Sequence, residues 1–265
     1  MIHCDACKPC NDGFPNHCER LQEIGFSVDG GYAKYIVVPA KLCWSLKKLA
    51  GKVNHIFKSG SLVEPLSVSY NAVIERGGGI HPGENVVILG AGPIGLGAVA
   101  ILKRAGAALC IVSEPNAHRV MMAEKYGADY VIDPTDDNLV EAVMDYTDGE
   151  GASLYLEATG RPQDVIEDIQ DCIWNCKAVN SKVVIVARSE YTMPVAGEIF
   201  QVKRAQIIGA QGHSGHGTFS KVISLMASGM DMEGMITKTI SLEEVPENLK
   251  LLQKDKENCK ISVLF

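Results

Sequence analysis

Two hydrophobic patterns meet near Glu64. Before this residue, apolar and polar side chains tend to alternate, as in Tyr32–Val38, which lies between Gly30-Gly31 and Pro39. Such alternation predicts short, partly exposed strands. After Glu64, apolar runs alternate with segments of helical period. That order is typical of right-handed βαβ units around a parallel sheet.

The second part has a regular succession of predicted elements. We expect Gly106 and Gly127 to end two of its helices in left-handed caps. The predicted strands are 86–89, 109–112, 130–132, 154–156, 183–186, 207–208 and 261–264, and the predicted helices are 94–105, 116–126, 138–146, 164–176, 219–227 and 243–251. The sequence therefore predicts an α/β fold with a doubly wound parallel sheet.

Composition limits the class of protein. A chain of 265 residues is long enough for about two domains. Its formal net charge of −7, without a basic tract, argues against nucleic acid or an anionic membrane as the main partner. The longest apolar run, Val86–Leu102, contains five glycines and prolines and falls short of a membrane span. We expect a cytoplasmic protein with reduced thiols, because no secretory segment begins the sequence.

Four cysteines stand at C-x2-C-x2-C-x7-C near the start of the chain. They are Cys4, Cys7, Cys10 and Cys18. This spacing suits four thiolates around one tetrahedral Zn²⁺, and four thiolates leave no position for substrate. The sequence therefore predicts one structural zinc per chain. A disulfide framework or a catalytic metal is the weaker alternative, and His17 is interpreted as an exposed neighbour.

The sequence Gly90-Ala-Gly92-Pro-Ile-Gly95 fits the dinucleotide-binding pattern G-x-G-x-x-G. The pattern alone is common, but here it follows a predicted strand and opens a predicted helix, whose N-terminus favours a phosphate. Glu114 ends the next strand 24 residues after Gly90 and can accept hydrogen bonds from an adenosine ribose. The alternative is that Glu114 only caps the helix beginning near Asn116.

Glu114 also bears on the choice of cofactor. Its charge would repel a 2′-phosphate by up to about 4 kcal/mol, for unit charges ~4 Å apart at an effective dielectric of ~20. NAD is therefore favoured over NADP. Arg119 has the opposite effect, because an arginine near the ribose can accommodate a 2′-phosphate.

With these pieces in one order, the sequence resembles the zinc-dependent medium-chain dehydrogenases, and within them the sorbitol dehydrogenase-like polyol branch. The matching motifs are the four-cysteine loop, Gly30–Ala33, Leu62–Val68, Gly90–Gly95 and Glu157–Gly160. A narrower resemblance, to the inosose dehydrogenases of that branch, rests on Asn16–Cys18, Ser61–Val68 and Gln211–Phe219.

The resemblance implies a fold, an activity and an assembly. The fold would combine a Rossmann sheet with an incomplete β-rich, GroES-like catalytic domain: residues 1–68 carry the zinc loop, 69–212 bind NAD, and 213–265 return to the catalytic domain. The activity would be hydride transfer between NAD and a secondary alcohol, such as an inositol, inosose or sugar alcohol. A homodimer or homotetramer is implied, and uncovered β edges would otherwise reduce solubility.

Further cofactor contacts follow from the resemblance by position. Ile94, beside Pro93 in the turn, would lie over the pyrophosphate, and Arg119 near the adenosine. The residues around the nicotinamide would be Val186, Ala210, Gln211 and Gly212. Arg188 departs from the small or apolar residue usual in this family.

The family also uses a second, catalytic zinc that polarises the substrate alcohol. Its cysteine and its histidine-glutamate pair lie before the four-cysteine loop, so a loop at residue 4 indicates an N-terminally truncated form. Glu64 is the one family ligand that carries over, and its alternative is a helix N-terminal acid favoured by the dipole. Two functions therefore stay open: a polyol dehydrogenase, or a catalytically incomplete NAD-binding module with a structural zinc. A zinc-independent reductase is a weaker third possibility, since such proteins generally lack the four-cysteine loop.

Several other histidines and cysteines are candidate metal ligands. His213 and His216 flank glycines in a loop expected near the nicotinamide, where they could recruit a metal, bind substrate or face solvent. Cys172 and Cys176 share a helix face, as a metal pair or as core residues. The remaining residues of these types match no motif: His3, His55, His81, His118, Cys43, Cys110 and Cys259.

Overall fold

The chain divides into two units in the computed structural model, which describes residues 1–190, 192–213, 217–252, 255 and 257–265. Unit 1 comprises residues 1–67 and 212–265, and unit 2 comprises residues 68–211. In the described part of the chain, no helix has the length and apolar character needed to cross a membrane.

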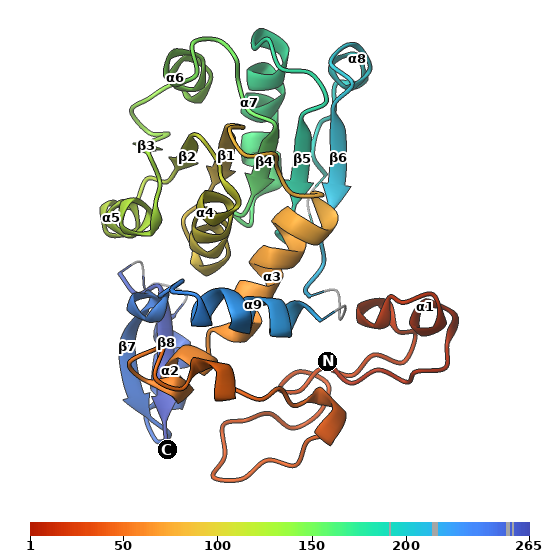
Figure 1. Ribbon diagram of the computed structural model, residues 1–265, viewed down its shortest axis with the longest axis vertical. Helices are drawn as coiled ribbons and strands as arrows, with labels where there is room; N and C mark the ends of the chain where they lie inside the picture. The colour runs from red at the N-terminus through yellow and green to blue at the C-terminus, as the bar shows by residue number, and fades with distance from the viewer. Residues whose placement is uncertain (191, 214–216, 253–254, 256) are drawn as a thin grey trace. The chain divides into compact units, whose positions relative to one another are not determined.

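Unit 2 is built on a six-stranded parallel sheet with the order β3-β2-β1-β4-β5-β6 (Figure 1). The strands are β1 Val86–Leu89, β2 Cys110–Ser113, β3 Tyr130–Ile132, β4 Leu154–Glu157, β5 Lys182–Ile185 and β6 Gln206–Gly209. This order is that of a Rossmann fold, in which ligands bind at the carboxyl ends of the strands. The α/β prediction is confirmed.

Helices connect the strands of unit 2. They are α4 Pro93–Ala105, α5 Ala117–Tyr126, α6 Leu139–Tyr146, α7 Pro162–Asn175 and α8 Gly197–Val202, preceded by α3 Val63–Tyr70 and a π-helical turn at Asn71–Arg76. Gly106 and Gly127 end α4 and α5 in the left-handed conformation, as predicted. Asn116 and Asn138 cap α5 and α6 by accepting backbone N–H bonds.

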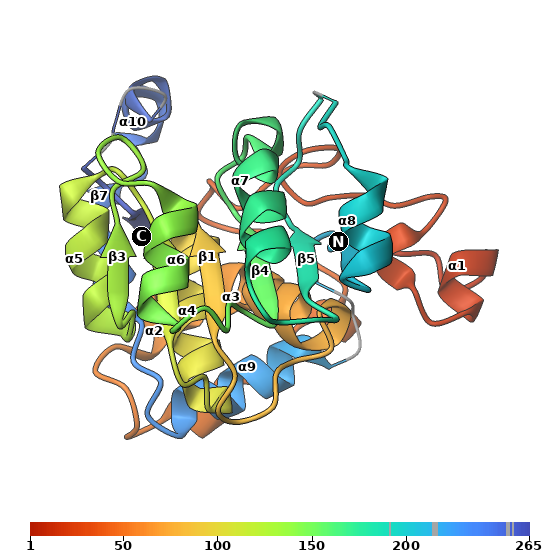
Figure 2. The same cartoon turned by 90° about the horizontal axis from the view of Figure 1, so that it is seen from above.

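The core of unit 2 lies on both faces of the sheet. On one face, Val87, Tyr155 and Val183 pack with apolar residues of α6, α7 and α8, and α6 and α7 run side by side over this face (Figure 2). On the other, Ile88 meets α4 at Gly95. Burial on both faces explains why the fully buried strands β1, β2 and β4 are mainly apolar.

Unit 1 contains less regular structure. Its elements are α1 Lys8–Asn11, α2 Ile56–Gly60, α9 Thr218–Ala227, α10 Val245–Leu251 and a two-stranded parallel sheet of β7 Ile236–Ser241 and β8 Lys260–Leu264. Four 3₁₀ turns occur at Pro15–His17, Ala40–Leu42, Lys47–Leu49 and Glu233–Met235. Isolated bridges pair Ile2 with Gln22 and Ile24 with Val28. Buried residues of α9, including Val222 and Met226, supply part of its core.

The strand predicted at Tyr32–Val38 is wrong. This segment belongs to no strand and bends at residues 33–34, and Tyr35 is 82% and Val37 100% exposed. A strand is stabilised by cross-strand pairs and burial, and no described segment pairs with this one. Elsewhere, predicted boundaries differ by one or two residues, and the sequence reasoning missed β7, α2, α3 and α8.

Candidate functional site

The glycine-rich turn joins β1 to α4 in unit 2. Gly90 has φ +97°, and a Cβ there would lie 2.8 Å from the carbonyl oxygen of Ala158. A Cβ on Gly95 would lie 1.9 Å from the carbonyl oxygen of Gly90, so this glycine allows helix and strand to pack closely. Gly92, the N-cap of α4, has nothing within 4 Å of its Cβ position. The turn therefore keeps open space beside Gly92, at the N-terminus of a 13-residue helix.

Glu114 follows β2 and is only 4% exposed. Its Oε2 accepts the Ala91 N–H at 2.8 Å, and its Oε1 accepts the Asn116 N–H at 3.0 Å. The cap of α5 is Asn116, whose Oδ1 accepts the Arg119 N–H at 3.1 Å. Glu114 thus ties the glycine turn to the β2–α5 loop rather than serving only as a cap. A carboxylate offers about four acceptor positions, so two are left for a ligand.

Arg119 lies beside this carboxylate, with Nη1 4.0 Å from Glu114 Oε2. Its Nε is buried and has no hydrogen-bond partner among the described residues. The sequence predicted opposite effects of Glu114 and Arg119 on the choice between NAD and NADP. In the folded chain these two side chains form an ion pair with each other.

Three other predicted residues lie just beyond strands of the same sheet. The Val186 N–H, after β5, donates to the Glu157 carbonyl at 3.2 Å, and the Ala210 N–H, after β6, donates to the Ile185 carbonyl at 2.9 Å. Gln211 accepts a bond from Asn71 Nδ2 at 3.3 Å through its carbonyl oxygen. Parallel strands end at one edge, so these residues share an edge with Gly90 and Glu114.

The remaining predicted contacts are placed as follows. Ile94, after Pro93 in the first turn of α4, is half-buried, and its carbonyl accepts the Ser69 hydroxyl at 2.7 Å. Arg188 is exposed, three residues beyond β5. Gly212 belongs to unit 1.

Glu157, the last residue of β4, is a site residue that the sequence reasoning missed. It is fully buried, and its Oε1 accepts the Thr159 N–H at 2.8 Å and the Thr159 hydroxyl at 2.7 Å. These bonds hold the turn whose Ala158 carbonyl faces Gly90. The sequence signal resembles that of Glu114, because Glu157 is an acid directly after the predicted apolar strand 154–156.

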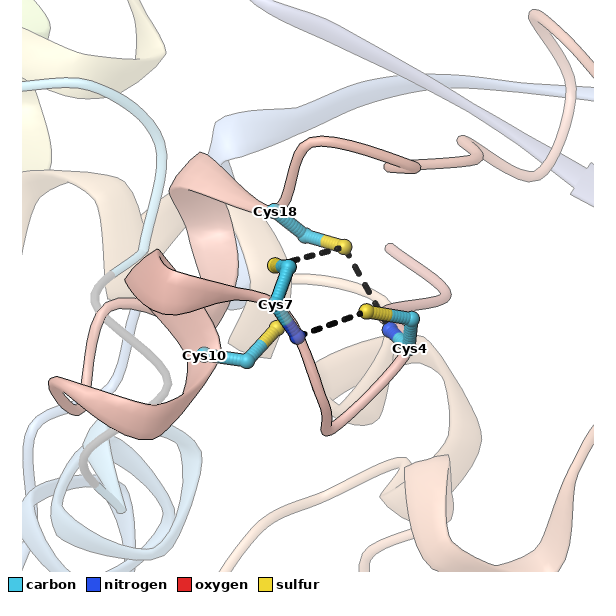
Figure 3. Close-up of side chains that lie close together, drawn as sticks. All are labelled: Cys4, Cys7, Cys10 and Cys18. Carbon is cyan, nitrogen blue, oxygen red and sulfur yellow. Dashed lines mark hydrogen bonds between the residues drawn. The ribbon is translucent and has the colours of Figure 1, made fainter.

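In unit 1, the four cysteines of the first loop come together (Figure 3). Cys7 is the N-cap of α1, Cys10 lies inside α1, and Cys18 follows the turn at Pro15–His17. Their sulfur atoms and that of Cys4 all lie within 4.8 Å of one another. No disulfide joins any of the nine cysteines. Four converging thiols are a donor set that fits tetrahedral Zn²⁺ and completes its coordination.

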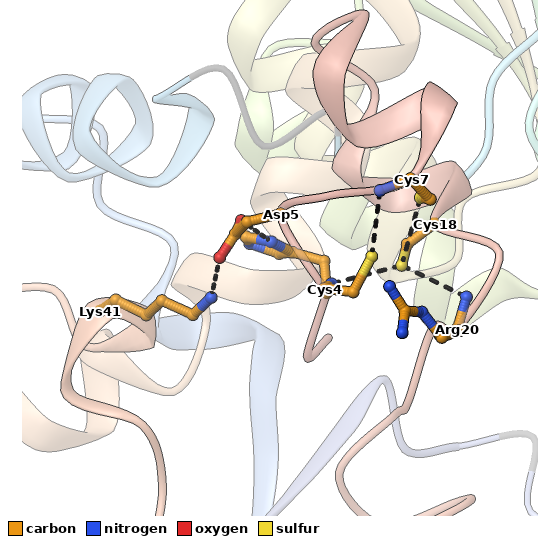
Figure 4. Close-up of polar contacts among 7 residues, drawn as sticks. Cys4, Asp5, Cys7, Cys18, Arg20 and Lys41 are labelled. Carbon is orange, nitrogen blue, oxygen red and sulfur yellow. Dashed lines mark hydrogen bonds and ion pairs between the residues drawn. The ribbon is translucent and has the colours of Figure 1, made fainter.

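Backbone donors surround these sulfurs (Figure 4). Cys18 Sγ accepts the N–H groups of Cys4 and Arg20, and Cys4 Sγ accepts that of Cys7, each at 3.3 Å. The N–H groups of Ala6 and Cys7 lower the pKa of Cys4 to about 6. Burial raises the pKa of Cys10 to about 12. The loop thus offers hydrogen bonds to anionic sulfur, and metal binding still has to displace the proton of Cys10.

Ion pairs anchor the same loop. Asp5 contacts Lys41, and its Oδ1 lies 2.6 Å from His3 Nδ1 (Figure 4). The hydrogen bond from Lys41, more than the contact with His3, holds the pKa of Asp5 below its usual range.

Among the described residues, the four cysteines form the only group of three or more potential metal ligands with donor atoms this close. Cys172 and Cys176 are buried, Cys172 within the core of unit 2, and burial raises the pKa of Cys172. His55 pairs with Glu233. His216 lies outside the described residues.

A cavity of about 600 Å³ lies in unit 1. Trp44, Phe219 and Phe26 form aromatic parts of its wall, and Glu64 and His213 contribute polar groups. Glu64 stands in the first turn of α3 and is exposed. The structure thus brings Glu64 and His213 to one cavity, without a third ligand close enough to complete a metal cluster among the described residues.

Comparisons with known proteins assign the family. Residues 93–228 match the model of the zinc-binding dehydrogenases, and residues 1–48 match the GroES-like domain of alcohol dehydrogenases. Scyllo-inosose 3-dehydrogenase of Thermotoga maritima is 60% identical over 266 aligned positions, which cover 100% of this chain and 67% of that enzyme. The chain thus spans about two thirds of this relative's length.

Solved structures agree with this assignment. One from Thermotoga maritima, described as an alcohol dehydrogenase, has a TM-score of 0.97 and 59% identity, covering 100% of this chain and 67% of its own. A zinc-binding dehydrogenase of Sinorhizobium meliloti bound to NADP has a TM-score of 0.84 and 27% identity, covering 100% and 74%. These matches confirm the Rossmann and GroES-like prediction, and with it an oxidoreductase that uses NAD(P) and zinc. The chain belongs to the zinc-binding dehydrogenase family.

Proposed function

We propose that this chain transfers hydride between NAD and a secondary alcohol of an inositol, inosose or sugar alcohol. The observation that carries the proposal is the glycine turn, with open space at Gly92 and the Glu114 carboxylate on the next strand. The similarity to a scyllo-inosose 3-dehydrogenase supports the substrate class. In this proposal residues 69–212 bind NAD, and residues 1–68 with 213–265 form the catalytic domain.

Each residue of the turn has a separate task in holding NAD. Gly92 leaves room for the pyrophosphate, and the N–H groups that begin α4 donate to its oxygens. Glu114 accepts hydrogen bonds from the adenosine ribose, and its negative charge, in a buried position, disfavours a 2′-phosphate. Arg119 already lies beside Glu114, which reduces its capacity to attract that phosphate. The bound nicotinamide supplies the hydride acceptor.

The cavity of unit 1 is suited to a hydroxylated substrate. Glu64 can accept a hydrogen bond from a hydroxyl group, and Trp44 and Phe219 can cover the apolar C–H face of a ring. A metal held at Glu64 would polarise the reacting oxygen and lower the pKa of the alcohol. Glu64 would orient that oxygen, while the four cysteines keep the structural zinc.

A second candidate function is an NAD-binding module that carries only the structural zinc. It is favoured because the described residues assemble a single metal-ligand cluster, that of the four cysteines. The two candidates differ in the expected metal count: one zinc per chain for the module, and two for the enzyme.

Metal counting, cofactor titration and turnover distinguish these candidates. Purified protein supplied with zinc is analysed for metal, titrated with NAD and NADP, and assayed with myo-inositol and scyllo-inosose. NAD-linked turnover supports the enzyme, whereas one zinc and NAD binding without turnover support the module. Failure to bind NAD contradicts both.

A pair of glycine variants tests the cofactor site itself. We expect Gly92→Ala to weaken NAD binding at least tenfold, because the new methyl group occupies the space beside the turn. Gly197→Ala, which also has nothing within 4 Å of its Cβ position, is the matched control and leaves NAD affinity unchanged.

We also propose that the chain works as a homodimer or homotetramer. Exposed apolar side chains of unit 1, among them Tyr35, Val37 and Phe265, support this. A monodisperse, stable monomer in light scattering at micromolar concentration contradicts it.

A further inference from the structure

The imidazole of His213 is held by a row of aromatic rings in the wall of the unit 1 cavity. Its ring centroid lies 4.7 Å from that of Phe219, and Phe219 lies 4.4 Å from Trp44, both pairs tilted. Phe219 stands in the first turn of α9, so its position depends on that helix. This packing restricts the orientation of the imidazole before any substrate binds.

The two nitrogens of this ring have different surroundings. Nδ1 is buried and has no hydrogen-bond partner among the described residues. The side chain as a whole is half-buried and lines the cavity, so the edge of the ring that carries Nε2 is the one left to face it. Burial lowers the pKa of His213 to about 4. The ring is therefore neutral at pH 7, and one of its nitrogens carries the only proton.

Burial determines which nitrogen that is. A proton on Nδ1 would leave a buried N–H donor unpaired, and such donors are rarer in proteins than unpaired acceptors. A proton on Nε2 places the N–H where water or a ligand can accept it. His213 thus presents a hydrogen-bond donor, and Glu64, in the wall of the same cavity, presents acceptors.

We propose that His213 is a specificity residue that donates its Nε2–H to an oxygen of a polyhydroxylated ring or chain. Donor and acceptor in one cavity select a ligand with several oxygens, one that accepts from His213 and another that donates to Glu64. A single hydroxyl group can satisfy both only where the imidazole and the carboxylate face the same oxygen, whereas a polyol can bond each of them through a different hydroxyl group. This inference rests on the proposed function, because it assigns the polyol to this cavity.

The tautomer is tested without substrate. In protein labelled with ¹⁵N-histidine, long-range ¹H–¹⁵N spectra assigned with His213→Phe are expected to show His213 protonated at Nε2 and unchanged between pH 6 and 8. A proton on Nδ1, or a charged ring at pH 7, overturns the inference.

Selectivity is tested with variants that separate packing from hydrogen bonding. His213→Phe keeps an aromatic ring against Phe219 but removes the donor, so we expect the KM for myo-inositol to rise about tenfold while the KM for cyclohexanol and the NAD affinity stay unchanged. His213→Gln keeps an N–H donor and is expected to recover part of the loss. His118→Phe, at an exposed histidine in unit 2, is the matched control.

Direct binding keeps this test independent of turnover. If the wild type does not turn over inositol, saturation-transfer NMR still compares myo-inositol binding to the wild type and His213→Phe. Weaker binding to the variant supports the inference even though the proposed activity fails. Equal binding to both proteins, or no binding to the wild type, overturns it.

Discussion

The two units reach a folded state by different means. In unit 2, Val87 and Val183 are fully buried between a parallel sheet and the helices that connect its strands. In unit 1, Val37 is fully exposed, and the first eighteen residues contain one four-residue helix and one 3₁₀ turn. The difference shows that burial of apolar side chains stabilises unit 2. The cysteine loop of unit 1, residues 4–18, depends instead on its four thiols and a few ion pairs.

Removal of zinc should produce the largest difference in stability between the cysteine loop of unit 1 and the sheet of unit 2. We expect a chelator, or Cys18→Ser, to unfold the cysteine loop, because structural zinc contributes an apparent ~10 to 16 kcal/mol in small sites. Hydrogen exchange should then increase across residues 4–18 while β1 and β4 stay protected. Cys43→Ser, at an exposed cysteine, is the control and should change neither region. Equal loss of protection in both units would show that they do not fold independently.

The same contrast explains what could be predicted from sequence. The strand at Val86–Leu89 was located correctly, because a buried parallel strand is a short apolar run between turn residues. The ends of α4 and α5 were found because Gly106 and Gly127 supply a conformation that other residues avoid. These signals are local. Tyr32–Val38 carries an equally clear strand pattern, but a strand also needs a neighbour, which its own residues do not specify.

The candidate sites divide in the same way. The cysteine spacing and the glycine turn are local motifs, so their residues were identified from sequence. The Glu157–Thr159 bonds are also local, but the contact of that turn with Gly90 joins residues more than sixty positions apart. So does the aromatic row that holds His213, in which Trp44 and Phe219 come from opposite ends of the chain. Such contacts depend on the completed fold.

A glycine substitution tests how strongly unit 2 depends on close packing. Gly95→Ala would place a methyl carbon 1.9 Å from the Gly90 carbonyl oxygen, so α4 has to move away from β1. We expect a loss of about 2 to 3 kcal/mol in unfolding free energy, measured by urea denaturation of the unit 2 signal. Gly92→Ala is the matched control, because its methyl group meets open space and should change stability by less than about 0.5 kcal/mol. Equal stability of both variants would contradict this packing role.

A partly buried acid, Glu233, tests the polar contacts of unit 1. Glu233 accepts bonds from the His55 ring, the His55 N–H and the Ser59 hydroxyl. Burial acts to raise the pKa of Glu233, but these bonds outweigh it and hold the pKa below its ordinary value. The folded-state pKa is therefore lower than the unfolded one, so the stabilisation is present above about pH 4.3 and is lost as pH falls through the folded-state pKa.

Glu233→Gln should consequently reduce stability at pH 7 by about 1.5 kcal/mol. The difference from wild type should be smaller at pH 3 than at pH 7, because the stabilisation that depends on the carboxylate is lost as pH falls through its lowered folded-state pKa. Thermal unfolding at both pH values measures it, with Glu243→Gln, at an exposed acid of the same unit, as the control. A deficit that persists unchanged at pH 3 would mean that the charge of Glu233 is not the cause.

The smallest expected effect concerns a single helix of unit 2. Asn138 Oδ1 accepts the N–H groups of Val140 and Glu141 at 2.9 and 3.1 Å, which would otherwise lack partners at the start of α6. Asn138→Ala should cost about 1 kcal/mol, whereas Asn138→Asp keeps the acceptor and should retain the stability. Because Leu139 and Val143 anchor α6 in the core, we expect faster hydrogen exchange only in its first turn. Exchange that increased across the whole sheet would show that unit 2 relies on local polar contacts as much as unit 1 does.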